Sequence, residues 1–400
     1  MESKVKVVFA EAPAPGDVAA QGGEVRPDKF ALKAELAHRM EGMKMNDKTK
    51  RIQNFNSKKS PLSIIVGLPM PAEAKASLEL KAAKLPPNEF PGAEQLLPLW
   101  DEWLAFQQLN ELDDDRVLSL YPRQYDQGIY GAMFGAEMEC LLEPGSGWGW
   151  ASSNSLAFED KPYEELLALG FNPENAWLRR MRGDLRCFAE KFRGRLAVST
   201  IITVDGFNFA HQIRGSGFFE DIHDRPGELK ALLALAADIN IKFVEFQRDA
   251  TGESCGSGAY CLGGLFPART VAMSVDTYNM CSPATYEEFG RPYQQRLIDH
   301  FGGGAFHLHG NGRHLLPELA KLSGFVSVSV SDDGARTRAF DDRKKLRELG
   351  GELLLNINCG KDELAKAIRE KSLVPARYCA SCDNADEANR LLDQFRNYTM

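Results

Sequence analysis

The sequence has no long hydrophobic run. Its longest uncharged candidates, such as residues 62–72, are shorter than the roughly 20 apolar residues that a bilayer span needs, and residues 62–72 contain prolines. The opening residues, MESKVKVVFAEAPAPGD, also lack the apolar core of a secretory signal. These absences argue against a membrane-spanning or secreted protein, so a cytoplasmic location is expected by default.

Positively charged residues are fewer than negatively charged ones. The chain has 48 Lys and Arg against 56 Asp and Glu, for a net charge of −8, so binding to nucleic acid is not expected. No Gly-x-Gly-x-x-Gly follows a strand near the start of the chain, so a dinucleotide-binding fold has no support. The eight cysteines are scattered along a chain without a secretion signal, which argues against a disulfide framework.

The first 44 residues differ in composition from the rest. They are rich in Ala, Pro, Gly and charge, with weak periodicity. We interpret residues 1–44 as an N-terminal extension and residues 45–400 as the folded domain. At 400 residues and 44% hydrophobic content, the chain has enough apolar material for one decorated barrel or two smaller domains.

From residue 194 onward, short apolar strands alternate with longer helical patterns. This alternation implies a parallel sheet covered on both faces, and the count predicts a single (β/α)8 TIM-like barrel with an N-terminal extension. A doubly wound open sheet is the alternative. The predicted strands are 62–69, 116–121, 196–204, 269–275, 305–309, 325–330, 352–357 and 374–379. The predicted later helices are 225–240, 283–300, 315–322, 341–349, 361–371 and 385–395, and the Gly/Trp/Ser-rich stretch 145–154 is predicted as an exposed loop.

Catalytic groups of such barrels lie where the strands end, and two histidines occupy one of these ends. His307 and His309 are two residues apart, so on a strand they share a face and can chelate one metal ion. Cys379 ends the last predicted strand and is the expected third ligand. Two imidazoles and one thiolate leave a fourth position open, which is the form of a catalytic zinc site.

Other interpretations of these cysteines remain open. Cys379 and Cys382 form a Cys-x-x-Cys, which also occurs as a redox pair or a structural half-site, and Cys382 could replace Cys379 as the ligand. No second Cys-x-x-Cys occurs, so a four-cysteine zinc knuckle is excluded.

Further polar residues follow the other predicted strands. Asp276, His211 and Asn358 are the catalytic or pocket-lining candidates, with Asp276 as an acid, base or substrate-orienting group. A helix cap or a hydrogen-bonded loop carboxylate is an equal alternative for Asp276. The same alternatives apply to Asp332 and Asp333, and His314 is expected as a capping or surface residue of the following helix.

Three passages together resemble the uroporphyrinogen decarboxylase superfamily, which includes zinc-dependent corrinoid:thiol methyltransferases. They are GFNFAHQIRGSGFFEDIHDRPGE at 206–228, DTYNMCSPATYEEFGRPY at 276–293, and residues 306–316 taken with 379–389. The likeness covers roughly residues 45–400.

Within that superfamily the site pattern is closer to the methyltransferase branch. That branch carries His-x-Cys where this chain has His307-Leu308-His309, and a cysteine ten residues before an asparagine, as Cys379 stands before Asn389. His309 departs from the pattern, which puts a thiol substrate in doubt. The decarboxylases carry a histidine at the position of Cys379 and an arginine-rich motif after the first strand, where this chain has GLPMPAEAKASLEL.

The resemblance implies a zinc-dependent methyltransferase-like enzyme that moves a methyl group between a corrinoid and a thiol or related small acceptor. The corrinoid would sit on a separate partner protein, because no Asp-x-His-x-x-Gly segment is present. A cofactor-free decarboxylase of a tetrapyrrole or other carboxylate is the second interpretation, and a non-catalytic corrinoid- or tetrapyrrole-binding barrel is the third. A homodimer is a further expectation, since dimers are common among such barrels.

Overall fold

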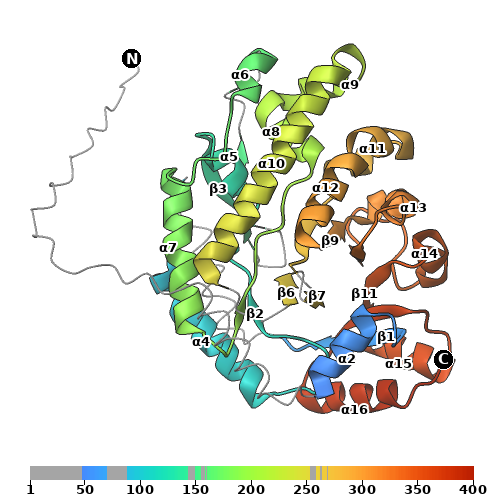
Figure 1. Ribbon diagram of the computed structural model, residues 1–400. Coiled ribbons are helices and arrows are strands. Elements are labelled where there is room, and N and C mark those ends of the chain that lie inside the picture. The colour runs from blue at the N-terminus through green and yellow to red at the C-terminus, as the bar shows by residue number, and fades with distance from the viewer. Residues whose placement is uncertain are drawn as a thin grey trace, which may run out of the picture. The chain divides into compact units, whose positions relative to one another are not determined.

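The structure, a computed structural model, describes residues 47–69, 88–142, 149–154, 158, 160–252, 258–261, 264–267 and 269–400 (Figure 1). The chain divides into two units, Met1–Lys44 and Met45–Met400, and every described residue belongs to the second. The predicted N-terminal extension therefore lies outside the described residues. No helix in the described ranges has the length and apolarity to cross a membrane.

A parallel six-stranded sheet organises the described part of the chain. Its strand order is β1-β12-β11-β10-β9-β8. The strands are β1 (Leu62–Gly67), β8 (Val271–Ser274), β9 (Gly303–Leu308), β10 (Phe325–Val330), β11 (Leu354–Gly360) and β12 (Ala376–Ser381). Six of the eight predicted strands are confirmed by this ladder, with shifts of a few residues at their ends.

Backbone hydrogen bonds continue from both edges of this sheet. At one edge Asp115 N donates to Ile64 O at 2.8 Å. At the other, Thr203 N donates to Ala272 O at 2.9 Å, and Ser274 N donates to Thr203 O at 3.1 Å. Between these points the short strands β2 (Ser119–Leu120) and β5 (Ala197–Val198) pair in parallel. A mixed α/β fold with a parallel sheet is thus confirmed, whereas the closed eight-stranded barrel stays a prediction.

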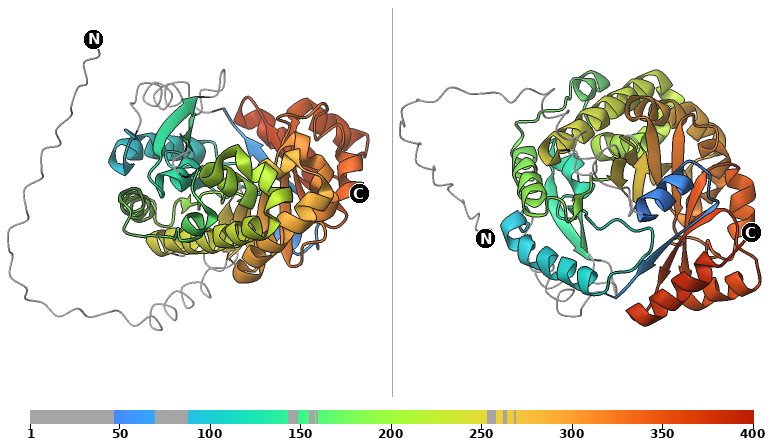
Figure 2. Two further views of the ribbon diagram at one scale, coloured as in Figure 1. Left: turned by 90° about the horizontal axis from the view of Figure 1, so that it is seen from above. Right: turned by 60° about the horizontal axis from the view of Figure 1, so that its bottom comes forward.

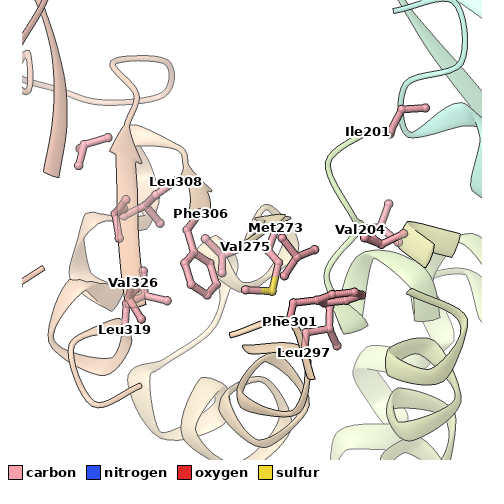
Figure 3. Packing of buried hydrophobic residues seen from close by; sticks show 14 of the residues in the cluster. Ile201, Val204, Met273, Val275, Leu297, Phe301, Phe306, Leu308, Leu319 and Val326 are labelled. Atoms are coloured by element: carbon pink, nitrogen blue, oxygen red, sulfur yellow. The ribbon is translucent and has the colours of Figure 1, made fainter. Parts of the chain in front are cut away.

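One face of the sheet is an apolar layer covered by helices. Met273, Phe306 and Val326 are buried and lie with Leu297 and Phe301 of helix α12 (Arg291–Phe301) in one cluster (Figure 3). Helices α12, α14 (Arg343–Gly350), α15 (Lys361–Arg369) and α16 (Ala385–Arg396) contact the strands and lie beside the sheet (Figure 2).

The opposite face of the sheet is polar at mid-height. Because side chains alternate along a strand, every second residue points to this inner face. One continuous row of residues paired in register crosses all six strands: Ser274, His307, Ser329, Asn356, Arg377 and Ser63. Several members of this row bond to one another: Asn356 Nδ2 donates to Ser329 Oγ at 3.3 Å, and Arg377 Nε donates to Ser63 Oγ at 3.3 Å. This face of the sheet is therefore polar and hydrogen-bonded across the strands.

Most helices that precede β8 in the sequence form a layer on the side away from α14, α15 and α16 (Figure 1). The longest, α10 (Pro226–Thr251), starts at a proline suited to a first helical turn and runs well past the predicted end at 240. Asp205 caps the helix α8 (Gly206–Arg214) by accepting from Asn208 N. The other helices of this layer are α4 (Ala93–Leu109), α5 (Gly128–Ala132), α6 (Tyr163–Leu167), α7 (Ala176–Lys191) and α9 (Phe218–Asp224). Helix α2 (Asp47–Asn56) instead contacts β1 and β7.

Several sequence predictions need correction. Residues 149–154 form strand β4, paired antiparallel with β3 (Glu137–Leu142), and Ala151 is buried, so this part is not the exposed loop that its Gly and Trp content suggested. The predicted helix 283–300 is two helices, α11 (Pro283–Phe289) and α12, which meet at Gly290. A further hairpin, β6 (Gly258–Cys261) with β7 (Gly264–Pro267), precedes β8.

The predicted helix 315–322 is shorter in the structure. It is one α-helical turn, α13 (Leu316–Leu319), and the 3-10 segment η3 (Gly310–Leu315) precedes it. Two other 3-10 segments are η1 (Gly215–Gly217) and η2 (Thr277–Met280). The segments η2 and η3 follow β8 and β9 directly and pack against each other. They hold the ends of these two strands together.

Candidate functional site

The carboxyl end of β9 presents two histidine side chains on the inner face of the sheet. His307 is the fifth residue of β9, and His309 stands just beyond its end. Their rings meet edge to face with centroids 4.7 Å apart. The chain then turns closely past the next loop, where a Cβ added to Gly310 would lie 2.4 Å from Ala335 Cβ. Glycine at this position therefore permits the turn that leaves both imidazoles at the strand end.

Asp276, which follows β8, completes a group of three. Its carboxylate and the two imidazoles offer ligand atoms that all lie within 4.8 Å of one another, the only such group among the described residues. Asp276 Oδ1 lies 3.0 Å from His309 Nε2. This oxygen is buried, yet it is not aligned for a hydrogen bond with His309 and has no other hydrogen-bond partner within the described ranges.

A second carboxylate, from Asp333, contacts the other ring nitrogen of His309. Asp333 Oδ2 contacts His309 Nδ1, and Ser331 Oγ donates to Asp333 Oδ1. The main-chain amide of Gly310 donates to Asp333 O at 2.9 Å. His309 thus lies between two carboxylates. Asp333 favours the tautomer with a proton on Nδ1, which leaves Nε2 free to face Asp276.

The surroundings shift the pKa values of the two histidines in opposite directions. Burial lowers the pKa of His307, and this effect outweighs the attraction of the Asp276 charge. His307 therefore favours the neutral form that binds metals. The pKa of His309 is raised, chiefly by Asp276. Without a cation between them, these two residues act as an ion pair.

The three side chains suit a divalent metal ion. Two imidazole nitrogens and one carboxylate oxygen are a ligand set that zinc accepts in catalytic sites, and the same set binds non-haem iron. The observation that favours a cation here is the convergence of the three ligand atoms, which all lie within 4.8 Å of one another at the end of two adjacent strands. The residues present therefore fit a metal ion with open coordination positions.

The arrangement of the chain is shared with a methyltransferase. No protein-family model matches this sequence, and no curated protein matches it. Among solved structures, a methyltransferase from Methanosarcina mazei superposes with a TM-score of 0.57 over 88% of this chain and 99% of its own, at 14% identity. The metallated homocysteine methyltransferase MmuM from Escherichia coli gives 0.29 over 59% of this chain and 88% of its own, at 16% identity. At 14% identity, the likeness to the Methanosarcina mazei methyltransferase shows a shared fold and nothing further.

Cys379, predicted as the third ligand, is not a member of the group. It lies on β12, which β10 and β11 separate from β9. It points to the same side of the strand as Arg377, whose guanidinium lies over the Phe55 and Phe266 rings. Burial raises the pKa of Cys379 to about 11, so the thiol is protonated at neutral pH. Its role as a metal ligand stays a prediction.

The remaining predicted residues are spread around this end of the sheet. Asn358 is exposed on β11 and pairs in register with Cys379. His211 is exposed on α8, one helical turn beyond Asn208. His314 contacts the Cys281 carbonyl at 2.9 Å. Neither His211 nor Asn358 belongs to the group of Asp276 and the two histidines.

Sequence reasoning missed the loop after β2. Tyr121 OH donates to Asp126 Oδ1 at 2.8 Å, and Ile202 N donates to Tyr121 OH at 3.4 Å. Asp126 has φ of 34°, an uncommon conformation for a residue other than glycine and typical of strained functional loops. Its position after a predicted strand was the available signal, but the strand is only two residues long.

Proposed function

We propose that this chain is a metal-dependent methyltransferase in which Asp276, His307 and His309 hold a zinc ion. The proposal includes the closure of the sheet into a TIM-like barrel through β2 and β5. The observation that carries it is the group of three ligand atoms around the buried Asp276 Oδ1 at the carboxyl end of β8 and β9. This is the end of a parallel α/β sheet where catalytic groups lie.

Zinc in such a site supplies Lewis acidity, which lowers the pKa of a bound thiol so that it can accept a methyl group. The residues of the chain prepare this chemistry. The neutral ring of His307 binds without first losing a proton, because its pKa is lowered by burial. Asp333 fixes the tautomer and orientation of His309. Asp276 supplies the negative charge that offsets part of the charge of the ion.

The methyl donor in this proposal is a corrinoid carried by a separate protein. The fold shared with a methyltransferase and the sequence resemblance to corrinoid:thiol methyltransferases support it. Cys379 is retained as a further ligand candidate, since it faces the same side of the sheet as His307. Such a role requires its thiol to approach the group.

The full-length chain loaded with zinc tests the proposal. We expect about one zinc ion per chain and methyl transfer from methylcobalamin to a thiol such as 2-mercaptoethanol. Strong chelators and the variants His307→Ala and Asp276→Ala should abolish both zinc binding and transfer. His300→Ala is the matched control, because His300 is an exposed histidine paired with Glu245 on the helical layer. Cys379→Ser shows whether the thiol adds to the affinity.

Two outcomes would contradict the proposal. Full zinc content in the His307→Ala and Asp276→Ala proteins would place the metal elsewhere. Decarboxylation of a tetrapyrrole or other carboxylate that persists in excess chelator, with no methyl transfer, would favour the cofactor-free decarboxylase.

A further inference from the structure

The loop between β10 and α14, residues 331–342, is folded around one arginine side chain. That residue is Arg313 of η3, whose side chain is only 11% exposed. One end of the guanidinium, Nη1, donates to the main-chain oxygen of Thr337 at 2.6 Å. The other end, Nη2, donates to Ser331 O at 2.9 Å and to Asp332 Oδ1 at 3.0 Å. One buried cation therefore holds both the start and the middle of the loop.

Two carboxylates of the same loop balance the charge of Arg313. Asp332 Oδ1 accepts from Arg313 and also from Ala339 N, which lies 2.6 Å away. Asp342 Oδ2 lies 3.7 Å from Arg313 Nη1. A planar guanidinium suits such a set of oxygens because its N–H groups diverge in one plane and carry a fixed charge. Without Arg313, these oxygens would lose the donors that hold the loop in this conformation.

Asp333, which contacts His309, belongs to the segment that Arg313 holds. Arg313 bonds to Ser331 and Asp332, the two residues that precede Asp333. The Asp333 carboxylate contacts His309 Nδ1 with one oxygen and accepts from Ser331 Oγ with the other. The Asp333 side chain is half exposed, so its direction depends mainly on the main chain that carries it. Arg313 can therefore act on His309 through Asp333.

We propose that Arg313 is a positioning residue of the metal site, which holds the loop that places Asp333 against His309. The effect on the metal rests on the proposed function, whereas the contacts of these three side chains do not. A histidine ligand binds a metal ion more tightly when a fixed carboxylate accepts from its other ring nitrogen. The affinity for the metal should thus depend on Arg313, although its guanidinium bonds to loop atoms rather than to the ligand residues.

A second arginine makes the same kind of bonds at the opposite end of the sheet. Arg347 of α14 is partly buried, and it donates to the main-chain oxygens of Pro375, at 3.1 Å, and Gly351. Pro375 precedes β12 and Gly351 precedes β11, so both lie at the amino ends of strands. Arg347→Met is therefore a matched control, which removes comparable hydrogen bonds without touching the loop that carries Asp333.

The metal-free, full-length chain tests the contact itself. The carbon-bound ring protons of His309 give NMR signals that can be assigned from their loss in His309→Gln, and Asp333→Ala should shift them. We expect Arg313→Met to shift them towards the positions of Asp333→Ala. Arg313→Lys should give an intermediate shift, because lysine keeps the charge but lacks the planar fork. Arg347→Met should leave the signals at the wild-type positions, even where thermal melting shows a loss of stability.

A double-mutant cycle on zinc affinity tests the route through Asp333. We expect Arg313→Met to raise the zinc Kd about 10-fold, as the loss of an outer carboxylate does. In an Asp333→Ala chain the same substitution should change the Kd by less than about twofold, because the contact through which Arg313 acts is already absent. Arg347→Met should leave the Kd within about twofold in both chains. If Arg313→Met fails to fold, Arg313→Lys carries both comparisons, with a smaller effect expected.

The two experiments separate this inference from the proposed function. A chain that binds no zinc but shows His309 signals that depend on Arg313 would reject the metal site and keep the positioning role. His309 signals that neither Arg313 variant moves would overturn the inference and leave the metal site standing. Zinc affinities at which the effects of Arg313→Met and Asp333→Ala simply add would also overturn it, since Arg313 would then not act through Asp333.

Discussion

Replacing Asp333 by asparagine should weaken metal binding without disturbing the fold. Asp333 contacts His309 Nδ1 with one oxygen and accepts from Ser331 with the other. An asparagine has the same shape, so its carbonyl oxygen can still accept from Nδ1 while its amino group donates to the Ser331 hydroxyl. The substitution therefore removes the negative charge and keeps the hydrogen bonds.

The geometry sets the expected size of the effect. Loss of such an outer carboxylate typically lowers metal affinity 10- to 100-fold. The Asp333 side chain is 51% exposed, so solvent screens its charge and the lower end applies to asparagine. We expect about a 10-fold rise in the zinc Kd, or about 1.4 kcal/mol. Asp333→Ala, which removes the hydrogen bonds as well, should approach the upper end.

A chelator competition assay measures these affinities. The wild-type chain, Asp333→Asn and Asp333→Ala are titrated with zinc against a chromophoric chelator, and the melting temperatures of the metal-free proteins are compared. Asp341→Asn, an exposed aspartate in the next segment, is the matched control and should match the wild-type affinity. Unchanged zinc affinity in both Asp333 variants would refute the assignment of Asp333 as the group that orients His309.

Two further predictions concern the packing and the charges behind the site. A Cβ at Gly312 would lie 1.8 Å from Asn279 Oδ1, so Gly312→Ala should cost about 1–3 kcal/mol in chemical denaturation, whereas Gly170→Ala, with nothing within 4 Å, should change stability by less than about 0.5 kcal/mol. Burial and the Asp276 charge raise the pKa of Asp205 to about 7, above the value of about 3.9 in the unfolded chain. Protonated Asp205 therefore contributes its full share of the free energy of unfolding below pH ~4, and this contribution is lost as the pH rises through about 7. Asp205→Asn should remove this slope, at most about 1.4 kcal/mol per pH unit, from the metal-free protein, and an unchanged pH profile of stability would contradict it.

The parallel sheet and the histidine pair were predictable because both depend on local sequence patterns. The strands of the six-stranded sheet are short runs rich in apolar residues, and helical segments follow them. Side chains alternate along a strand, so His307 and His309 lie on one face. Strand-end position also singled out Asp276, although as an acid, base or cap. Only the pairing of β8 with β9 brings it next to the histidines.

Features that depend on long-range geometry could not be predicted from the sequence. The expected ligand Cys379 sits three strands from His307, and strand-end position alone gives no distance across the sheet. The role of Asp333 depends on the close turn at Gly310, and the loop of Tyr121 and Asp126 follows a strand of two residues that carries almost no periodicity. The strand Gly149–Asn154 is rich in Gly and Ser, and pairing with β3 overrides that composition.

The most direct test of the central claim is a crystal structure of the zinc-loaded chain with anomalous difference maps on both sides of the zinc absorption edge. We predict one peak that appears only above the edge, about 2.0–2.2 Å from a nitrogen of His307, a nitrogen of His309 and an oxygen of Asp276. No peak among these three residues, or a peak bound by Cys379 and Cys382 without Asp276, would contradict the account.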